Sequence, residues 1–183
     1  VAFFSLDSRI RIYTELFEER GKQIYYTDTF QEYPTFNERQ IFIDLSENLS
    51  ILDILEKSSF LVKKLKADLI IIDYLQGIKG IQRKPQKEKD FENFVRLIKV
   101  LATSLDIPIL ILSKLPKKVE KRIGTKMPQL SDLEKYGNIQ PYCDTILFLY
   151  PWDYYGFIQD DEGNNLQDKA LLLAEKTPTG TKG

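Results

Sequence analysis

The sequence predicts an α/β fold in which helices flank a mainly parallel sheet. Short apolar segments alternate with longer segments of helical periodicity, which is the spacing of strand–helix–strand units. The run DLIIID, residues 68–73, is continuously apolar before its final acid, which is typical of a strand buried on both faces. The chain has 183 residues, 43% of them hydrophobic, so we expect one domain, residues 1–183, around a single core.

Each element of this fold is predicted from local pattern. Strands are predicted from short apolar runs at residues 1–6, 40–44, 68–73, 107–113, 144–150 and 169–176. Helices are predicted from apolar residues at helical spacing at 8–21, 50–65, 91–105 and, in a shorter form, 131–137. Ser50 and Asp53 form a capping-box pattern at the start of the second helix. Residues 23–38 are polar and aromatic and are predicted to be irregular.

Composition excludes several kinds of chemistry. The chain has no histidine, which excludes Ser-His-Asp and Cys-His catalysis and histidine-bound zinc. Cys143 is the single cysteine, so an internal disulfide is excluded as well. The sequence has no apolar run near the roughly 18–20 residues that a membrane span needs, and no signal-peptide pattern. We therefore expect a soluble, cytoplasmic protein with no membrane contact.

Polar side chains follow the predicted strands at the point where each strand ends. They are Ser5, Asp7, Asp73, Gln76, Ser113 and Lys114. In open parallel sheets, ligands bind beyond the carboxyl ends of the strands. Carboxylates, an amide and a lysine in that place suit a magnesium–phosphate ligand. Taken alone, Asp73 would be a turn-forming residue, because aspartate often begins turns.

Two basic loops follow strand ends, although the net charge is only -1. The first carries Lys79, Arg83, Lys84, Lys87 and Lys89; the second carries Lys114, Lys117, Lys118, Lys121, Arg122 and Lys126. Such clusters could track a phosphate backbone, or could simply be solvated loops. The aromatic residues of PWDYYGF, 151–157, could stack on bases, pack at an edge or form a subunit contact.

Several of these segments together resemble one known family. They are VAFFSLD, IFIDLSENLSILDI, LIIIDYLQ, IPILILSKL, MPQLSDLEKYGNIQPYCDTILFLY and TPTGT. In order and approximate spacing they are similar to the motor domain of DnaB-type replicative DNA helicases, over most of the chain. The resemblance implies a RecA-like P-loop NTPase core.

The resemblance also implies roles for individual residues. Asp73 matches the Walker B aspartate, which holds Mg²⁺, and Asp7 takes the place of the family's catalytic glutamate. Lys114 takes the place of a glutamine that senses the γ-phosphate, and Gln76 and Lys176 would bind nucleotide. The loop 131–138, with Glu134, Lys135 and Gly137, matches the loop that contacts single-stranded DNA, together with basic residues of the second loop. Those basic residues are Lys117, Lys118, Lys121 and Arg122.

Besides Lys114, the sequence departs from the family's pattern at further places. It contains no G-x-x-x-x-G-K-[ST] phosphate loop, which we expect before Val1, so the 1–183 domain would lack the Walker A strand and loop. Asp7 is one methylene shorter than glutamate. In the closing segment AEKTPTG, Lys176 is the nearby cation where the family presents an arginine to the neighbouring subunit.

These observations leave two main functions open. The first is an ATP- and Mg²⁺-dependent helicase motor, or a fragment of one, that acts on single-stranded DNA as a ring, a hexamer by resemblance, with a helicase loader or primase as further partners. The second is a degenerate, inactive module that binds DNA or a helicase. A structural α/β domain with no nucleotide link is a third possibility. We expect no ATPase activity from this chain by itself.

Overall fold

The structure is a computed structural model that describes residues 1–6, 24–27, 41–44, 46, 48–80 and 87–180. It divides into two compact units, Val1–Lys114 and Leu115–Gly183, which we describe separately. The expectation of a single domain stays a prediction. No helix of the described residues is long and apolar enough to cross a membrane.

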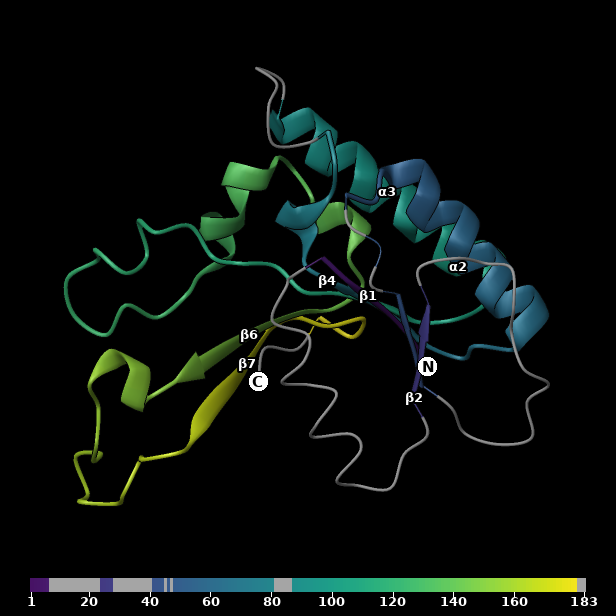
Figure 1. Cartoon of the computed structure of the whole chain (residues 1–183). Coiled ribbons are helices and arrows are strands. Elements are labelled where there is room, and N and C mark those ends of the chain that lie inside the picture. Colours follow the sequence, from purple (N-terminus) through teal and green to yellow (C-terminus); the bar gives the residue numbers. More distant parts are fainter. Residues whose placement is uncertain (7–23, 28–40, 45, 47, 81–86, 181–183) are drawn as a thin grey trace. The chain divides into compact units, whose positions relative to one another are not determined.

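A five-stranded parallel sheet organises the first unit (Figure 1). Its strands are β1 (Ala2–Ser5), β2 (Ile24–Thr27), β3 (Ile41–Asp44), β4 (Ile70–Asp73) and β5 (Ile109–Ile111). Their order across the sheet is β2-β3-β1-β4-β5, and every neighbouring pair is parallel. The predicted parallel sheet is therefore confirmed here, and its carboxyl ends all lie along one edge.

Two long helices pack on this sheet. Helix α2 (Ile51–Leu65) contacts β1, helix α3 (Lys87–Leu105) contacts β5, and the two helices contact each other. Phe4 and Ile72 from the strands and Ile54, Phe91 and Phe94 from the helices are fully buried. Burying each such side chain contributes about 1.5–3 kcal/mol, which explains why the apolar stripes in the sequence predict these elements well.

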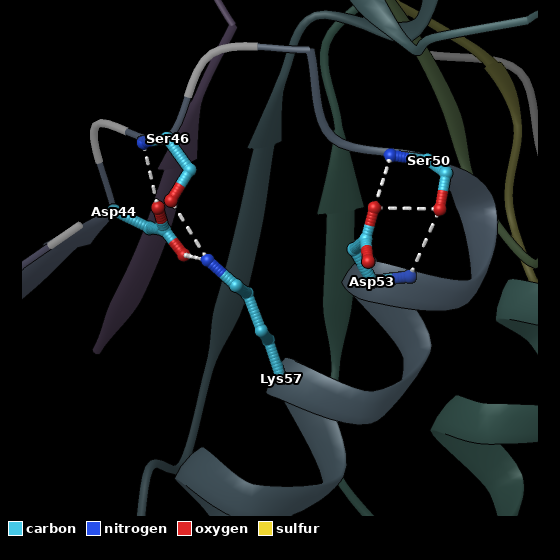
Figure 2. Close-up of polar contacts among 5 residues, drawn as sticks. All are labelled: Asp44, Ser46, Ser50, Asp53 and Lys57. Carbon is cyan, nitrogen blue, oxygen red and sulfur yellow. Dashed lines mark hydrogen bonds and ion pairs between the residues drawn. The ribbon is translucent and has the colours of Figure 1, made fainter. Parts of the chain in front are cut away.

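The start of α2 was predicted from its cap, and the structure confirms it (Figure 2). The Asp53 backbone N–H donates to Ser50 Oγ at 3.3 Å, and the Ser50 N–H donates to the Asp53 carboxylate at 2.8 Å. The Ser50 hydroxyl also donates to that carboxylate, at 2.6 Å. These hydrogen bonds from Ser50, the side-chain bond foremost, lower the pKa of Asp53.

One strand lies where the sequence predicted irregular structure. β2 occupies Ile24–Thr27, inside the segment 23–38, and pairs in parallel with β3. Four residues are too few for an alternating pattern to stand out, so the pairing partner rather than the local sequence decides this strand. The predicted helix over residues 8–21 lies outside the described residues.

The second unit has short helices and an antiparallel hairpin. The 3₁₀ helices are η3 (Leu130–Tyr136), η4 (Gln140–Tyr142) and η5 (Asp153–Tyr155), and the strands are β6 (Ile146–Pro151) and β7 (Ala170–Lys176). Figure 1 shows β6 and β7 side by side as a two-stranded sheet. The last two predicted strands are confirmed, but they pair antiparallel with each other. The predicted short helix near 131–137 is the 3₁₀ helix η3.

Candidate functional site

The carboxyl edge of the parallel sheet brings two of the predicted site residues together. Ser5, the last residue of β1, pairs in register with Asp73, the last residue of β4. The Leu6 N–H then donates to the Asp73 carbonyl oxygen at 2.6 Å, which extends the pairing beyond the strands. Ser5 is buried and Asp73 is half-buried. Neighbouring strands therefore place a hydroxyl and a carboxylate beside each other at the edge where ligands of parallel sheets bind.

The ends of β4 and β5 are joined through Gln76 of the 3₁₀ helix η2 (Leu75–Gly77). The side-chain amide of Gln76 donates to Ser113 Oγ at 2.8 Å and to the Lys114 carbonyl oxygen at 3.2 Å. Its Oε1 accepts from the Lys114 N–H at 3.2 Å. The structure thus gathers Gln76, Ser113 and Lys114 as the sequence predicted. The Gln76 amide holds the two strand ends together in this arrangement.

The ammonium group of Lys114 lies over an aromatic ring. Lys114 Nζ is 3.6 Å from the centroid of the Tyr74 ring, and Tyr74 follows Asp73 directly. A cation held over a ring at an exposed site is stabilised by about 0.5–1 kcal/mol, which is weak enough for a phosphate to displace it. Lys114 is therefore positioned next to the residue that carries the candidate metal carboxylate.

Gly77 is needed for the close packing of this edge. A Cβ atom at Gly77 would lie 2.6 Å from Leu6 Cβ and 3.3 Å from the Leu6 carbonyl oxygen. The backbone after β4 therefore approaches the end of β1 more closely than any side chain would allow. The glycine of DYLQG, directly after the predicted strand, was the signal in the sequence that could have indicated this close approach.

A buried ion pair that was not predicted from the sequence lies at the same edge (Figure 2). Asp44 ends β3, and Lys57 Nζ from α2 lies 2.6 Å from its Oδ2. The Lys57 ammonium also donates to Ser46 Oγ at 2.8 Å, and the Ser46 N–H donates to Asp44 Oδ1 at 2.8 Å. Only 12% of the Lys57 side chain and 5% of the Asp44 side chain are exposed. Asp44, like Asp73, is the last residue of a strand. This position in the sequence was the signal that could have marked Asp44 as a residue of the site.

The carboxylates at this edge fit one kind of metal binding. Among the residues that the structure describes, no three Asp, Glu, Cys or His side chains group as a metal cage. Mg²⁺ is commonly held by one or two carboxylates together with substrate phosphates and water. Asp73 beside the Ser5 hydroxyl fits that mode. Asp44 forms its ion pair with Lys57. Asp7, the predicted catalytic acid, lies outside the described residues.

The second basic loop begins the second unit and presents three lysines. Lys117, Lys118 and Lys121 are exposed, whereas Val119 between them is buried. The loop is therefore anchored through its apolar residue and carries its positive charge outward. These three residues keep their predicted role as candidate DNA contacts.

Arg122 has a different environment from these lysines. Its Nη2 lies 2.6 Å from Asp132 Oδ1, and its Nη1 donates to the Met127 carbonyl oxygen. The Asp132 side chain is only 2% exposed and also accepts from the Gln129 N–H, which caps η3. Arg122 thus joins the basic loop to η3. Its predicted contact with DNA stays a prediction.

The remaining predicted residues of the second unit occupy two places. Glu134 and Lys135 of η3 are exposed, and Gly137 ends the helix with a φ of 75°, a conformation that favours glycine. The Gly137 N–H donates to the Glu134 carbonyl oxygen at 3.0 Å. Lys176, the last residue of β7, donates from Nζ to the Gln140 carbonyl oxygen at 2.7 Å. Its predicted nucleotide contact stays a prediction.

Comparison with solved structures shows the fold. One solved ATPase domain matches with a TM-score of 0.72 and 21% identity, covering 100% of this chain and 68% of that one. The structure of a DnaB-like replicative helicase and its interactions with primase matches with a TM-score of 0.65 and 20% identity, covering 100% of this chain and 54% of that one. These similarities confirm the predicted RecA-like α/β fold.

Comparison of sequences shows the family. Residues 8–183 match the family described as DnaB-like helicase C terminal domain. The replicative DNA helicase DnaB of Geobacillus stearothermophilus is 34% identical over 142 residues, which are 77% of this chain and 31% of the relative. The chain thus spans about a third of that relative's length. On this evidence the chain belongs to the family of DnaB-like helicase C-terminal domains.

Proposed function

We propose that this domain is part of an ATP-driven replicative DNA helicase motor that acts on single-stranded DNA. The observation that carries the proposal is the position of Asp73, beside Ser5 at the carboxyl edge of a parallel sheet, in a member of this family. Ring assembly, as a hexamer, action in the cytoplasm and contact with a helicase loader or primase are parts of the same proposal. They are supported by family membership.

The nucleotide site would be built around the ends of β4 and β5. Bound Mg²⁺–ATP would supply the phosphoryl group whose transfer drives the motor. Asp73 would hold the magnesium ion through water, and Lys114 would leave the Tyr74 ring to contact a phosphate. Gln76 would keep both strand ends in place, with one face of its amide toward the nucleotide. Lys176 and Asp7 are proposed as further contacts on the evidence of resemblance.

The DNA site would be built on the second unit. Lys117, Lys118 and Lys121 are exposed on an anchored loop, and Lys135 is exposed on η3. Ammonium groups that follow a phosphate backbone supply most of the affinity for single strands. Glu134 would act against tight binding, because it adds a negative charge beside Lys135. We expect weak binding that decreases with salt.

The alternative function, an inactive module that binds DNA or a helicase, is favoured by the contacts of the altered residues. Lys114 rests on Tyr74, and Lys176 is bonded to the Gln140 carbonyl oxygen. Each cation that differs from the family pattern is therefore engaged within its own unit.

Nucleotide binding separates the two functions. The titration would use a fluorescent ATP analogue with and without Mg²⁺, on the purified protein and on two variants. Asp73→Asn should abolish Mg²⁺-dependent binding, whereas Asp68→Asn is the matched control, since Asp68 lies just before β4 at its opposite end and is 87% exposed. Mg²⁺-dependent binding that survives Asp73→Asn would contradict the assigned metal acid. DNA binding without nucleotide binding would favour the inactive module.

Hydrolysis is tested separately. We expect no phosphate release from ATP by this chain, with or without single-stranded DNA, because its residues lack the loop that cradles the β- and γ-phosphates. Turnover that Asp73→Ala abolishes would contradict this expectation.

A further inference from the structure

Tyr154, in the 3₁₀ helix η5, is a large aromatic side chain on the surface of the second unit. It is 67% exposed, whereas the other aromatic residues of the same segment, Trp152, Tyr155 and Phe157, are half-buried. Its ring lies edge-on against Tyr155, with centroids 5.0 Å apart and planes at 86°. Tyr155 in turn stacks on the buried Tyr150, with centroids 4.4 Å apart and planes at 6°. The exposed ring is therefore supported by Tyr155, which is itself held by its stacking on Tyr150.

The same side chain is tied to the basic loop. The Tyr154 hydroxyl donates to Glu120 Oε1 at 3.3 Å, and Glu120 stands between Lys118 and Lys121 in the sequence. A second hydrogen bond joins the Tyr150 hydroxyl to the Thr125 carbonyl oxygen, further along the loop. The aromatic segment and the basic loop therefore form one surface, held together at two points. The ring of Tyr154 lies within this surface and faces solvent.

We propose that Tyr154 is a stacking platform for a base of single-stranded DNA, next to the lysines that contact its phosphates. The inference rests on the proposed DNA binding of the basic loop and adds the residue that would read a base face. Glu120 repels phosphate, so the neutral base rather than the backbone would occupy the place beside it. Lys117, Lys118 and Lys121, which flank Glu120 in the sequence, would neutralise phosphates. A ring fixed before binding loses little conformational freedom when a base stacks on it.

The binding free energy expected from this contact can be taken from base–aromatic stacking in other proteins that bind single strands. Base–aromatic stacking is worth about 1–3 kcal/mol per base, or about 5- to 150-fold in affinity. It adds no charge, so it should change the affinity without changing the salt dependence. It also requires a base, so an abasic strand should not benefit from it. These two properties distinguish stacking from a phosphate contact.

The test is fluorescence anisotropy at low salt with two labelled strands of equal length, oligo(dT) and an abasic strand. The wild-type protein should bind oligo(dT) at least about 5-fold more tightly than the abasic strand. Tyr154→Ala should lose that difference and keep its salt slope, and Tyr154→Phe should keep most of it. Ile158→Ala, which removes an exposed aliphatic residue of the same segment, is the matched control and should bind as the wild type does.

Other outcomes of this experiment would contradict a specific part of the proposal. Equal wild-type affinity for the two strands overturns the stacking proposal and leaves phosphate binding intact. Wild-type protein that binds neither strand overturns the proposed DNA binding and the stacking proposal with it. If Tyr154→Ala instead alters the mass measured by sedimentation while binding of both strands is unchanged, the ring serves a subunit contact and the proposal is wrong. The comparison of the two strands on wild-type protein needs no variant to fold.

Discussion

Replacing Lys57 with methionine should destabilise the first unit by about 3 kcal/mol. The Lys57 ammonium lies 2.6 Å from Asp44, and the two side chains are 12% and 5% exposed. Removing one member of a buried ion pair costs about 3–5 kcal/mol, because the other charge is left in the interior. Ser46 still donates its N–H to Asp44 at 2.8 Å, which favours the lower end of that range. Methionine keeps the length and the apolar packing of the stem.

The double variant Asp44→Asn/Lys57→Met tests the origin of that cost. It removes both charges, so it leaves no unpaired ion in the interior. We expect it to be destabilised by about 1 kcal/mol, which is less than the single variant. The difference of about 2 kcal/mol between the single and the double variant would be the cost of leaving the Asp44 carboxylate buried without its partner.

The assay is urea denaturation followed by two signals. Circular dichroism at 222 nm reports the α-helices, and both described ones, α2 and α3, lie in the first unit. Fluorescence reports Trp152, the single tryptophan, in the second unit. With an m-value of about 2 kcal/mol/M, the helix signal should shift its midpoint by about 1.5 M. A single-domain chain predicts the same shift in the tryptophan signal, whereas independent units predict none.

A destabilisation below about 1 kcal/mol for Lys57→Met would refute the reasoning, since the pair would then be solvated rather than buried. A double variant as unstable as the single one would also refute it, because the cost would then come from packing.

Two further predictions concern the cap of α2 and the basic loop. Ser50→Ala should cost about 1 kcal/mol at pH 7. Because hydrogen bonds lower the pKa of Asp53 below 3.8, their stabilisation is present above that pH and is lost as the pH falls through the depressed value. In thermal unfolding, Ser50→Ala should therefore destabilise the protein less at pH 2.5 than at pH 7. Equal destabilisation at the two pH values would contradict this prediction. Arg122→Met should destabilise the second unit by about 2–3 kcal/mol, because it leaves the buried Asp132 carboxylate without its ion-pair partner. If Arg122 serves this ion pair alone, the salt slope of DNA binding should stay unchanged. Lys121→Met should leave the stability unchanged and reduce the salt slope of DNA binding by about 0.7. A reduced salt slope for Arg122→Met would show that Arg122 also contacts a phosphate.

The elements that could be predicted from the sequence are those whose signal is local. The apolar run before Asp73 predicted a buried parallel strand, and Ser50 with Asp53 predicted the start of α2. Both signals are contained in a few neighbouring residues. β2 was missed because its four residues carry no such pattern, and its pairing with β3 decides its conformation. The antiparallel pairing of β6 and β7 was also not predicted, since a strand's apolar pattern does not state the direction of its neighbour.

The contacts of the candidate site depend on strand order, which local sequence does not encode. Gln76 bonds Ser113 and Lys114 across separations of 37 and 38 residues, and Lys57 reaches Asp44 across 13. The strand-end rule did predict that polar residues gather at one edge. It could not predict which of them bond one another. For this reason Gln76 was predicted as a ligand contact, and its role in joining two strand ends emerged from the structure.

The distribution of the cations favours DNA binding as the more robust half of the proposed function. Of the cations proposed to contact nucleotide, Lys114 is held over Tyr74 and Lys176 is bonded to the Gln140 carbonyl oxygen. A nucleotide would have to displace such contacts before it gained from the charge, so part of its binding free energy would be lost. The exposed lysines 117, 118 and 121 need no such rearrangement. Loss of nucleotide chemistry would therefore leave this surface able to bind a single strand, and ATP binding and DNA binding should fail independently when Asp73 and Lys121 are changed one at a time.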